Sequence, residues 1–349
     1  MQEIIFRNVD GVLICNIPDK KCLDGDEVTK IASYTVNTWQ QNRGEAETYD
    51  NTVQGKLAEY ALEQYLERQT SIRYLSYDKF RSDNFKKHAP FDGLIFSAHQ
   101  RKDVLDQCIE VINNEVYNNG AGQITERLRE TLVEHGVFTI EIKSSQLRDK
   151  DYKGVLHIDH DRTDEDYKCI VENIRKWDYF VYPHYTRRSD QIASFYEYAE
   201  QVRRQAEYAD LGNQEFLKKL MLKEYRNACD IYTRLYFDYK TDEIFIPGYI
   251  LKLAFYRNPH IGKMPGGKSG MALYYMRSIS LGTTFLKMEK DQEIWNYDKD
   301  AAYSRLFAYH KKRCPNCGGY LQICNVKSRK TYSYRCFDCE NWYTLEQIN

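Results

Sequence analysis

The amino-acid sequence predicts an α/β protein, in which helices with one apolar side alternate with short buried strands. The stretch 51–69 has apolar residues three and four positions apart, as in a helix with one buried side. The stretches 138–146 and 178–182 are short apolar runs of the kind that forms buried strands. A helix is expected between them at 164–176, because acidic residues begin that stretch and basic residues end it.

The composition is that of a soluble globular protein. The chain has 349 residues, of which 42% are hydrophobic and 29% charged, and its net charge of −1 means that any basic surface must be local. No apolar run reaches the roughly 18 residues of a membrane-spanning helix, so no membrane partner is expected. The first residues do not resemble a secretory signal, and the 10 cysteines are therefore expected to be reduced thiols of a cytoplasmic protein, some of them holding a metal.

Three parts are expected along the chain: an N-terminal extension, a main domain and a small C-terminal module, at residues 1–45, 46–300 and 311–349. Helical insertions are expected in the main domain at 101–135 and 189–236, where apolar or basic and aromatic residues recur at helical spacing. A further strand is expected at 243–252, bent at its Pro-Gly pair.

The C-terminal module carries the clearest local signal. Cys314 and Cys317 form one C-x2-C pair, and Cys336 and Cys339 form a second pair after it. Four thiolates in two tight turns fit a closed tetrahedral Zn²⁺ site, and the pattern resembles zinc ribbons. We therefore expect one structural Zn²⁺ per chain, on which this small module depends to fold.

Basic residues in two places indicate contact with a nucleic-acid backbone. Residues 311–335 contain seven Lys or Arg and no Asp or Glu, interleaved with tyrosines. A basic, glycine-rich loop lies at 257–270. The candidate nucleic-acid-binding residues are Lys263, Lys268, Lys327, Arg329 and Lys330. The alternative for the module is a structural or protein-binding ribbon.

The glycine-rich loop also contains the letters G-x-x-x-x-G-K-S of a phosphate-binding P-loop, from Gly262 to Ser269. The residues Arg257 to His260 intervene between the preceding apolar stretch and this motif, and no apolar strand ending in Asp follows it. We therefore expect a loop that contacts phosphate groups and no nucleotide cofactor.

The strand at 138–146 places Glu141 and Lys143 on one side and Ile142 on the other, because side chains alternate along a strand. Charges near a core are costly unless they pair or bind a ligand, so the two residues form either a salt bridge or part of a site. Two more carboxylates are candidates: Glu59 at the centre of the 51–69 helix, and Asp92 at the entrance of an apolar strand. Taken alone, Glu59 is a solvated or salt-bridged helix residue and Asp92 a turn former.

Two His and two Asp gather at 157–161, in the sequence His-Ile-Asp-His-Asp. Their spacing matches no defined metal site, and no cysteine lies beside them. A charged loop is expected, with contact to a substrate as a secondary role.

The order of these elements resembles the αβββαβ core of the PD-(D/E)xK nuclease superfamily, which has the restriction-endonuclease-like fold. The letters G-K-L-A-E ending at Glu59, F-D-G around Asp92 and E-I-K-S from Glu141 resemble the superfamily's helix, strand entry and E-x-K core. The resemblance covers roughly residues 50–185. More residues separate Asp92 from Glu141 than is usual between the corresponding positions of that superfamily. The resemblance therefore requires the 101–135 insertion to lie between them.

The resemblance implies a Mg²⁺-dependent endonuclease of the restriction type acting on double-stranded DNA, with catalytic residues Glu59, Asp92, Glu141 and Lys143. Asp92 and Glu141 would offer hard oxygen ligands to Mg²⁺, and Lys143 would orient the attacking water. Cutting both strands often takes two active sites, so a homodimer is one expectation. The alternatives are a repair, recombination or phage-type nuclease, and a non-catalytic zinc-ribbon DNA-binding protein in which Glu141 and Lys143 form only a salt bridge.

Overall fold

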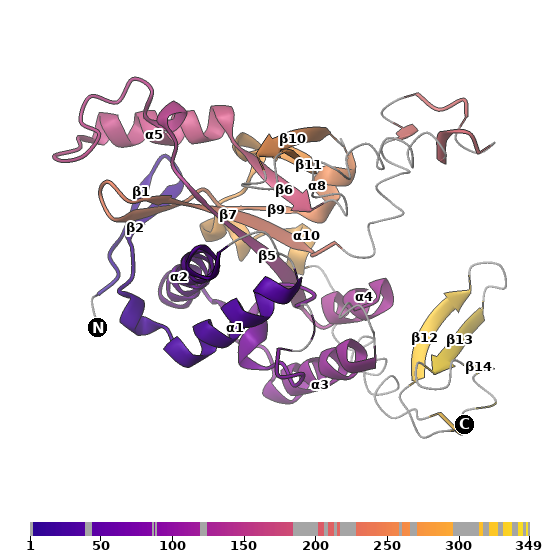
Figure 1. The fold of residues 1–349 in the computed structure, drawn as a ribbon. Helices are drawn as coiled ribbons and strands as arrows, with labels where there is room; N and C mark the ends of the chain where they lie inside the picture. The colour runs from indigo at the N-terminus through magenta and orange to yellow at the C-terminus, as the bar shows by residue number, and fades with distance from the viewer. Residues whose placement is uncertain are drawn as a thin grey trace. The chain divides into compact units, whose positions relative to one another are not determined.

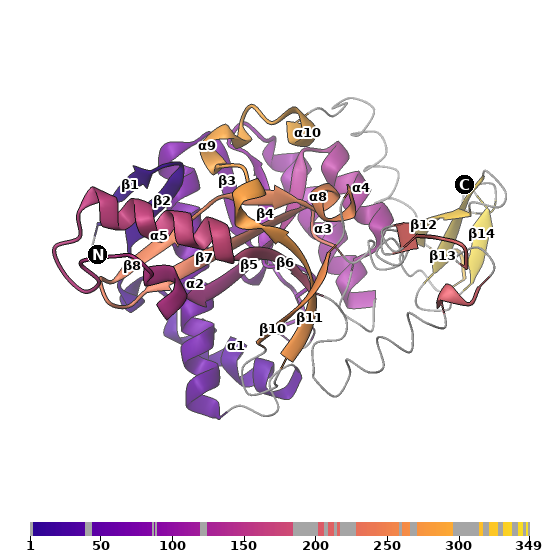
Figure 2. The ribbon, with the colours of Figure 1, turned by 90° about the horizontal axis from the view of Figure 1, so that it is seen from above.

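The computed structural model describes residues 3–38, 44–85, 87, 89–118, 124–183, 202–205, 209–212, 215–216, 228–257, 260–265, 271–295, 314–316, 321–326, 331–336, 341–344 and 347. The fold is mixed α/β, as the sequence predicts (Figures 1 and 2). The chain forms two compact units, one from residues 1–70 and 140–288 and the other from 71–139 and 289–349. None of the helices in the described ranges is long and apolar enough to cross a membrane.

The first unit is built on a mixed sheet. Its strands follow the order β1 (Phe6–Val9), β2 (Val12–Asn16), β8 (Glu243–Ile246), β7 (Ile231–Asp238) and β5 (Val137–Gln146), and the short β9 (Tyr249–Leu251) also pairs with β7. β5 and β7 run parallel, whereas β1 with β2, β2 with β8, β8 with β7 and β9 with β7 pair antiparallel. β1 and β2 form a hairpin that turns at Asp10 and Gly11, both of which have positive φ. All eight residues of β7 are buried.

Helices cover both sides of this sheet. Figure 1 shows α2 (Glu45–Gln69) on one side of β5 and β7, and α5 (Asp164–Trp177) with β6 (Tyr179–Pro183) on the other. α2 buries the predicted apolar stripe, and the ring of its Tyr65 lies 5.6 Å from that of Phe6 on β1. α5 begins with a capping box between Thr163 and Asp166. The other helical segments of the unit are η1 (Lys20–Cys22), α1 (Gly25–Thr38), η3 (Asp149–Tyr152), α8 (Lys252–Arg257), η6 (Ile279–Leu281) and α9 (Phe285–Met288).

The stretch 178–182 is a strand as predicted, but it lies outside the sheet that contains β5. β6 pairs antiparallel with β11 (Met271–Ser278), which pairs in turn with β10 (Ile261–Pro265), in a separate three-stranded sheet. The strand parallel to β5 is β7, which begins at Ile231 inside the segment expected to be helical. Its β-branched and aromatic residues favour a strand buried on both sides, and this tertiary burial outweighs the helix-like pattern before it.

The strand expected at 243–252 is confirmed as β8 and β9, separated by Pro247 and Gly248. Gly248 has φ +122°, a conformation that side chains other than glycine rarely adopt. A Cβ atom there would also collide with the backbone carbonyl of Thr283, so both space and backbone geometry require glycine at this bend.

The second unit contains an antiparallel pair, a helical hairpin and a small sheet. β3 (Ile72–Ser76) pairs with β4 (Gly93–Ser97), and η2 (Tyr77–Lys79) follows β3. The predicted helical insertion is confirmed as α3 (Lys102–Asn118) and α4 (Glu126–Glu134), where buried Glu115 accepts a 2.6 Å hydrogen bond from the Thr125 N–H. α10 (Gln292–Trp295) and an antiparallel sheet of β12 (Leu321–Val326), β13 (Thr331–Cys336) and β14 (Trp342–Thr344) complete the described part.

Candidate active site

Glu141 and Lys143 form a partly buried ion pair on β5. The Lys143 ammonium donates a hydrogen bond to Oε1 of Glu141, and the two side chains are 34% and 15% exposed. Their neighbours Ile140 and Ile142 are buried, as the alternation of a strand requires. The sequence-based expectation that these two residues share one side of a buried strand is confirmed. Their pairing is compatible both with a structural salt bridge and with a site that waits for a ligand.

Cys229 is the third group at this pair. It lies just before β7, 3% exposed, and its Sγ is 3.9 Å from Oε2 of Glu141. Its backbone N–H donates to the Tyr232 hydroxyl at 2.9 Å. Both carboxylate oxygens of Glu141 therefore have a contact, one with an ammonium and one with a thiol. Sequence reasoning missed Cys229, because it lies 88 positions from Glu141 and no local motif marks it.

Arg234 on β7 adds a second buried cation beside Lys143. The parallel register places Arg234 opposite Lys143, on the same side of the sheet. Its guanidinium donates to Oγ of Ser145 at 2.8 and 3.0 Å and to the backbone carbonyl of Tyr179 at 2.8 Å. These hydrogen bonds fix the position of the positively charged guanidinium. Arg234 was not among the predicted site residues, because 189–236 was expected to be a helical insertion.

Glu59 lies on α2, which contacts the other side of β5. Gln54 of this helix donates to the Ser144 hydroxyl at 3.0 Å and accepts from the Gln146 side chain at 3.4 Å. Ser144 and Gln146 alternate with Glu141, so they point to the opposite side of the strand. Glu59 itself accepts a 2.7 Å hydrogen bond from Lys56. Its predicted role near the Glu141–Lys143 pair stays a prediction.

Asp92 belongs to the second unit, where it directly precedes β4. Its backbone carbonyl accepts hydrogen bonds from the Tyr77 N–H at 2.9 Å and from the Tyr74 hydroxyl at 3.1 Å. Phe91 beside it is buried. These contacts hold Asp92 at the entrance of a strand, as expected from the sequence, and its role as a metal ligand stays a prediction.

The described residues contain no group of three or more His, Cys, Asp and Glu side chains arranged to hold a metal ion. The loop at 157–161 is thus no metal site of this kind, and the Mg²⁺ site expected at Asp92 and Glu141 stays a prediction. Of the four expected Zn²⁺ ligands, Cys317 and Cys339 lie outside the described residues. Cys314 is buried with its Sγ 3.1 Å from the Tyr343 hydroxyl, and Cys336 ends β13 opposite Leu321.

The residues expected to contact nucleic acid fall mostly outside the described part of the chain. Lys263 lies on β10, and Lys268, Lys327, Arg329 and Lys330 are among the residues not described. The P-loop letters begin within β10, and the next described element is strand β11. A phosphate-binding P-loop needs a loop followed by a helix, so this arrangement does not have its geometry.

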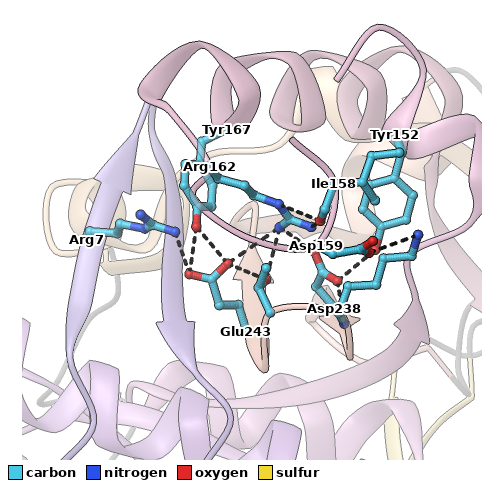
Figure 3. Close-up of polar contacts among 10 residues, drawn as sticks. Arg7, Tyr152, Ile158, Asp159, Arg162, Tyr167, Asp238 and Glu243 are labelled. Carbon is cyan, nitrogen blue, oxygen red and sulfur yellow. Dashed lines mark hydrogen bonds and ion pairs between the residues drawn. The ribbon is translucent and has the colours of Figure 1, made fainter. Parts of the chain in front are cut away.

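The 157–163 loop is anchored by a buried polar cluster around Arg162 (Figure 3). The Arg162 guanidinium donates to Asp238 at 2.5 Å and to the Ile158 carbonyl, and its side chain is 1% exposed. Tyr152 donates to Asp238 at 2.7 Å. Burial is the main cause that raises the pKa of the Tyr152 hydroxyl above its usual value, with Asp238 adding to it. Tyr152 therefore stays a neutral donor, and the cluster is a closed network that holds the loop.

Glu243 joins this cluster to the N-terminal hairpin (Figure 3). It accepts hydrogen bonds from Arg7 at 2.5 Å, from Tyr167 at 3.1 and 3.2 Å and from Thr241 at 2.7 Å. The Arg7 guanidinium also lies over the ring of Tyr167, 3.4 Å from its centre. These contacts tie β1, β8 and α5 together.

His157 is held by Asp166, which forms the capping box of α5 with Thr163. The imidazole Nδ1 lies 2.9 Å from Asp166 Oδ2, and the carboxylate also accepts from the N–H groups of Thr163 and Leu156. Hydrogen bonds, first that from the Thr163 N–H and then the one from His157, lower the pKa of Asp166 well below its usual range. The loop is irregular and exposed, as expected for a charged loop.

Comparisons with known proteins add no identification. A scan against protein-family models, a search of curated proteins and a search of solved structures each find no match for this chain.

Proposed function

We propose that the protein is a Mg²⁺-dependent endonuclease of the restriction type, which hydrolyses phosphodiester bonds in double-stranded DNA. The observation that carries the proposal is the Glu141–Lys143 pair, a carboxylate and an ammonium side by side at the polar end of a buried strand. The resemblance of the sequence around it to the PD-(D/E)xK superfamily supplies the reaction class. The three antiparallel strands β12, β13 and β14 are compatible with a C-terminal zinc ribbon that helps to hold DNA.

Glu141 is the carboxylate that would hold Mg²⁺, with Asp92 as the proposed second ligand. Enzymes that act on phosphate groups often hold Mg²⁺ by one or two carboxylates, while phosphate oxygens and water complete the shell. Glu141 fits such a role, since its carboxylate oxygens contact a flexible, partly exposed lysine and a thiol. Mg²⁺ bound there would neutralise phosphate charge and lower the pKa of a bound water.

Lys143 and Arg234 supply positive charge for the reacting phosphate. The partly exposed Lys143 ammonium would donate hydrogen bonds to phosphate oxygens and steady the negative charge that develops at phosphorus. It would also orient the attacking water, as proposed from the sequence. Arg234 is too deeply buried to touch a substrate, but its fixed charge beside Lys143 adds to the attraction for an anion.

A non-catalytic DNA-binding protein is the second candidate function. The direct hydrogen bond between Lys143 and Glu141 favours it, because a closed ion pair is also what a purely structural salt bridge would show.

Plasmid cleavage tests the proposal. The full chain is incubated with supercoiled plasmid and Mg²⁺, beside the Lys143→Ala variant and a control, Lys30→Ala, which removes an exposed lysine of α1. Wild type and control should cut, and Lys143→Ala should be at least about 100-fold slower. Discrete fragments would support a restriction enzyme, whereas ragged degradation would favour a repair or phage-type nuclease. DNA that stays intact but is retarded on a gel would refute catalysis and favour the second candidate.

A further inference from the structure

The C-terminal end of α5 exposes a tryptophan. Trp177 is 44% exposed, although its large apolar ring usually lies mostly inside a protein. The Lys176 ammonium lies 4.8 Å from the centre of this ring. The next residue, Asp178, is only 1% exposed, so the chain turns inward and leaves the indole at the surface.

Basic side chains gather around this tryptophan. η3 and the residue after it lie along α5, because Asn173 donates hydrogen bonds to the backbone carbonyls of Asp151 and Lys153 at 3.0 and 2.8 Å. Lys150 donates to the Trp177 carbonyl at 3.0 Å. Residues 148–153 and 172–177 contain more basic than acidic side chains that are not buried. The basic ones are Arg148, Lys150, Lys153, Arg175 and Lys176, and the acidic ones are Asp149 and Glu172.

Two buried carboxylates fix part of this arrangement. Asp151 and Asp178 are almost fully buried, and both Arg148 and Lys150 form ion pairs with each of them. The heads of Arg148 and Lys150 are therefore held beside Trp177. Their side chains nevertheless remain 42% and 34% exposed, so they still face solvent.

This surface lies on the same side of the sheet as the Glu141–Lys143 pair. Arg234, the register partner of Lys143, donates to the carbonyl of Tyr179, which is two residues after Trp177. Figure 1 shows α5 and β6 on one side of β5 and β7. Arg234 thus links the strand position beside the pair to the chain just after Trp177.

We propose that Trp177 and its basic neighbours bind unpaired nucleotides of the substrate, with a base stacked on the indole and phosphates held by Arg148, Lys150, Lys153 and Lys176. The inference rests on the proposed function, because it extends the substrate of that site to a single-stranded segment. Every base offers an aromatic face for stacking, and basic side chains complement the phosphates at any sequence. In a duplex the base faces are covered by neighbouring pairs, so the tryptophan distinguishes unpaired from paired strands.

Fluorescence anisotropy tests the inference with two probes, a labelled 20-nucleotide oligo-dT and a labelled duplex of the same length. In the full chain, Trp177→Ala should weaken binding of the single strand roughly 5- to 150-fold, and binding of the duplex much less. Trp177→Phe should keep most of the affinity, because it retains a stacking ring. Leu156→Ala, which truncates another exposed apolar residue near α5, should bind like wild type. Lys176→Gln should weaken both probes and reduce the salt dependence of binding by about one counterion.

The inference is refuted if Trp177→Ala binds the single strand as tightly as wild type does. That result beside normal plasmid cleavage would leave the nuclease proposal intact. A wild-type chain that neither binds nor cuts either kind of nucleic acid would instead overturn both. Circular dichroism of each variant checks that a loss of affinity does not come from misfolding.

Discussion

The buried pair of Arg162 and Asp238 should be the most sensitive ionic contact of the described first unit, and Asp238→Asn tests it. Asp238 is fully buried and accepts hydrogen bonds from Arg162, Tyr152 and the Lys240 N–H. Removing one charge of a buried pair usually costs about 3–5 kcal/mol, because the other charge stays buried without compensation. Asparagine keeps one acceptor oxygen, and Glu243 remains 3.6 Å from the guanidinium, so we expect the lower end, about 3 kcal/mol.

Asp159→Asn is the matched control, since it makes the same chemical change in the same region (Figure 3). Asp159 is 65% exposed and lies 3.6 Å from the Lys240 ammonium. Exposed pairs of this kind contribute about 0–1 kcal/mol, so the control should leave stability nearly unchanged.

Urea unfolding followed by circular dichroism at pH 7 measures both variants against wild type. Hydrogen exchange of the peptide that covers residues 156–163 reports whether the anchored loop opens. A double variant with Arg162→Met should lose less than the sum of the single losses, because it removes the stranded charge. Equal small effects of Asp238→Asn and Asp159→Asn, with unchanged exchange in the loop, would refute the reasoning.

Three further predictions concern pH, metal and backbone. The pKa of Asp166 is lowered in the folded protein, so its carboxylate should stabilise the fold above the unfolded-state pKa of about 4 and lose that effect as pH falls. In urea unfolding, Asp166→Asn should therefore lower the free energy of unfolding more at pH 7 than at pH 3. Equal losses of unfolding free energy at the two pH values would contradict this. Elemental analysis should find one zinc per chain, lost in Cys314→Ser but kept in the buried-thiol control Cys108→Ser. Urea unfolding should show that Gly248→Ala lowers the free energy of unfolding by about 2 kcal/mol or more, because Gly248 has a positive φ and the Thr283 carbonyl lies close to it. Gly55→Ala is the control: it lies within α2 with open space around it, so it should raise the free energy of unfolding by about 0.5–1 kcal/mol.

Local patterns predicted much of the fold. The helix with one apolar side at α2, the capped helix α5 and the helical hairpin of α3 and α4 depend on residues a few positions apart, so the sequence alone shows them. The bend at Pro247 and Gly248 is equally local. The alternation that places Glu141 and Lys143 on one side of β5 follows from strand geometry.

Contacts between distant segments could not be predicted in the same way. The apolar sequence of β6 is compatible with pairing to more than one strand. Its pairing with β11 is decided by tertiary packing. Cys229 and Arg234 come close to β5 because β7 lies parallel to it, and no short-range pattern announces that pairing. The sequence pattern before β7 indicates a helix, so it does not show that a strand begins at Ile231.

The parallel pairing of β5 and β7 sets an order of events during synthesis. Ser145 and Arg234 are 89 positions apart, so the ribosome must add most of a small domain before the two strands can meet. Until then the charged end of β5 lacks its neighbouring strand, together with the thiol and the guanidinium that flank the pair. A nascent chain whose synthesis has not passed β7 therefore has the Glu141–Lys143 pair without Cys229 and Arg234 beside it.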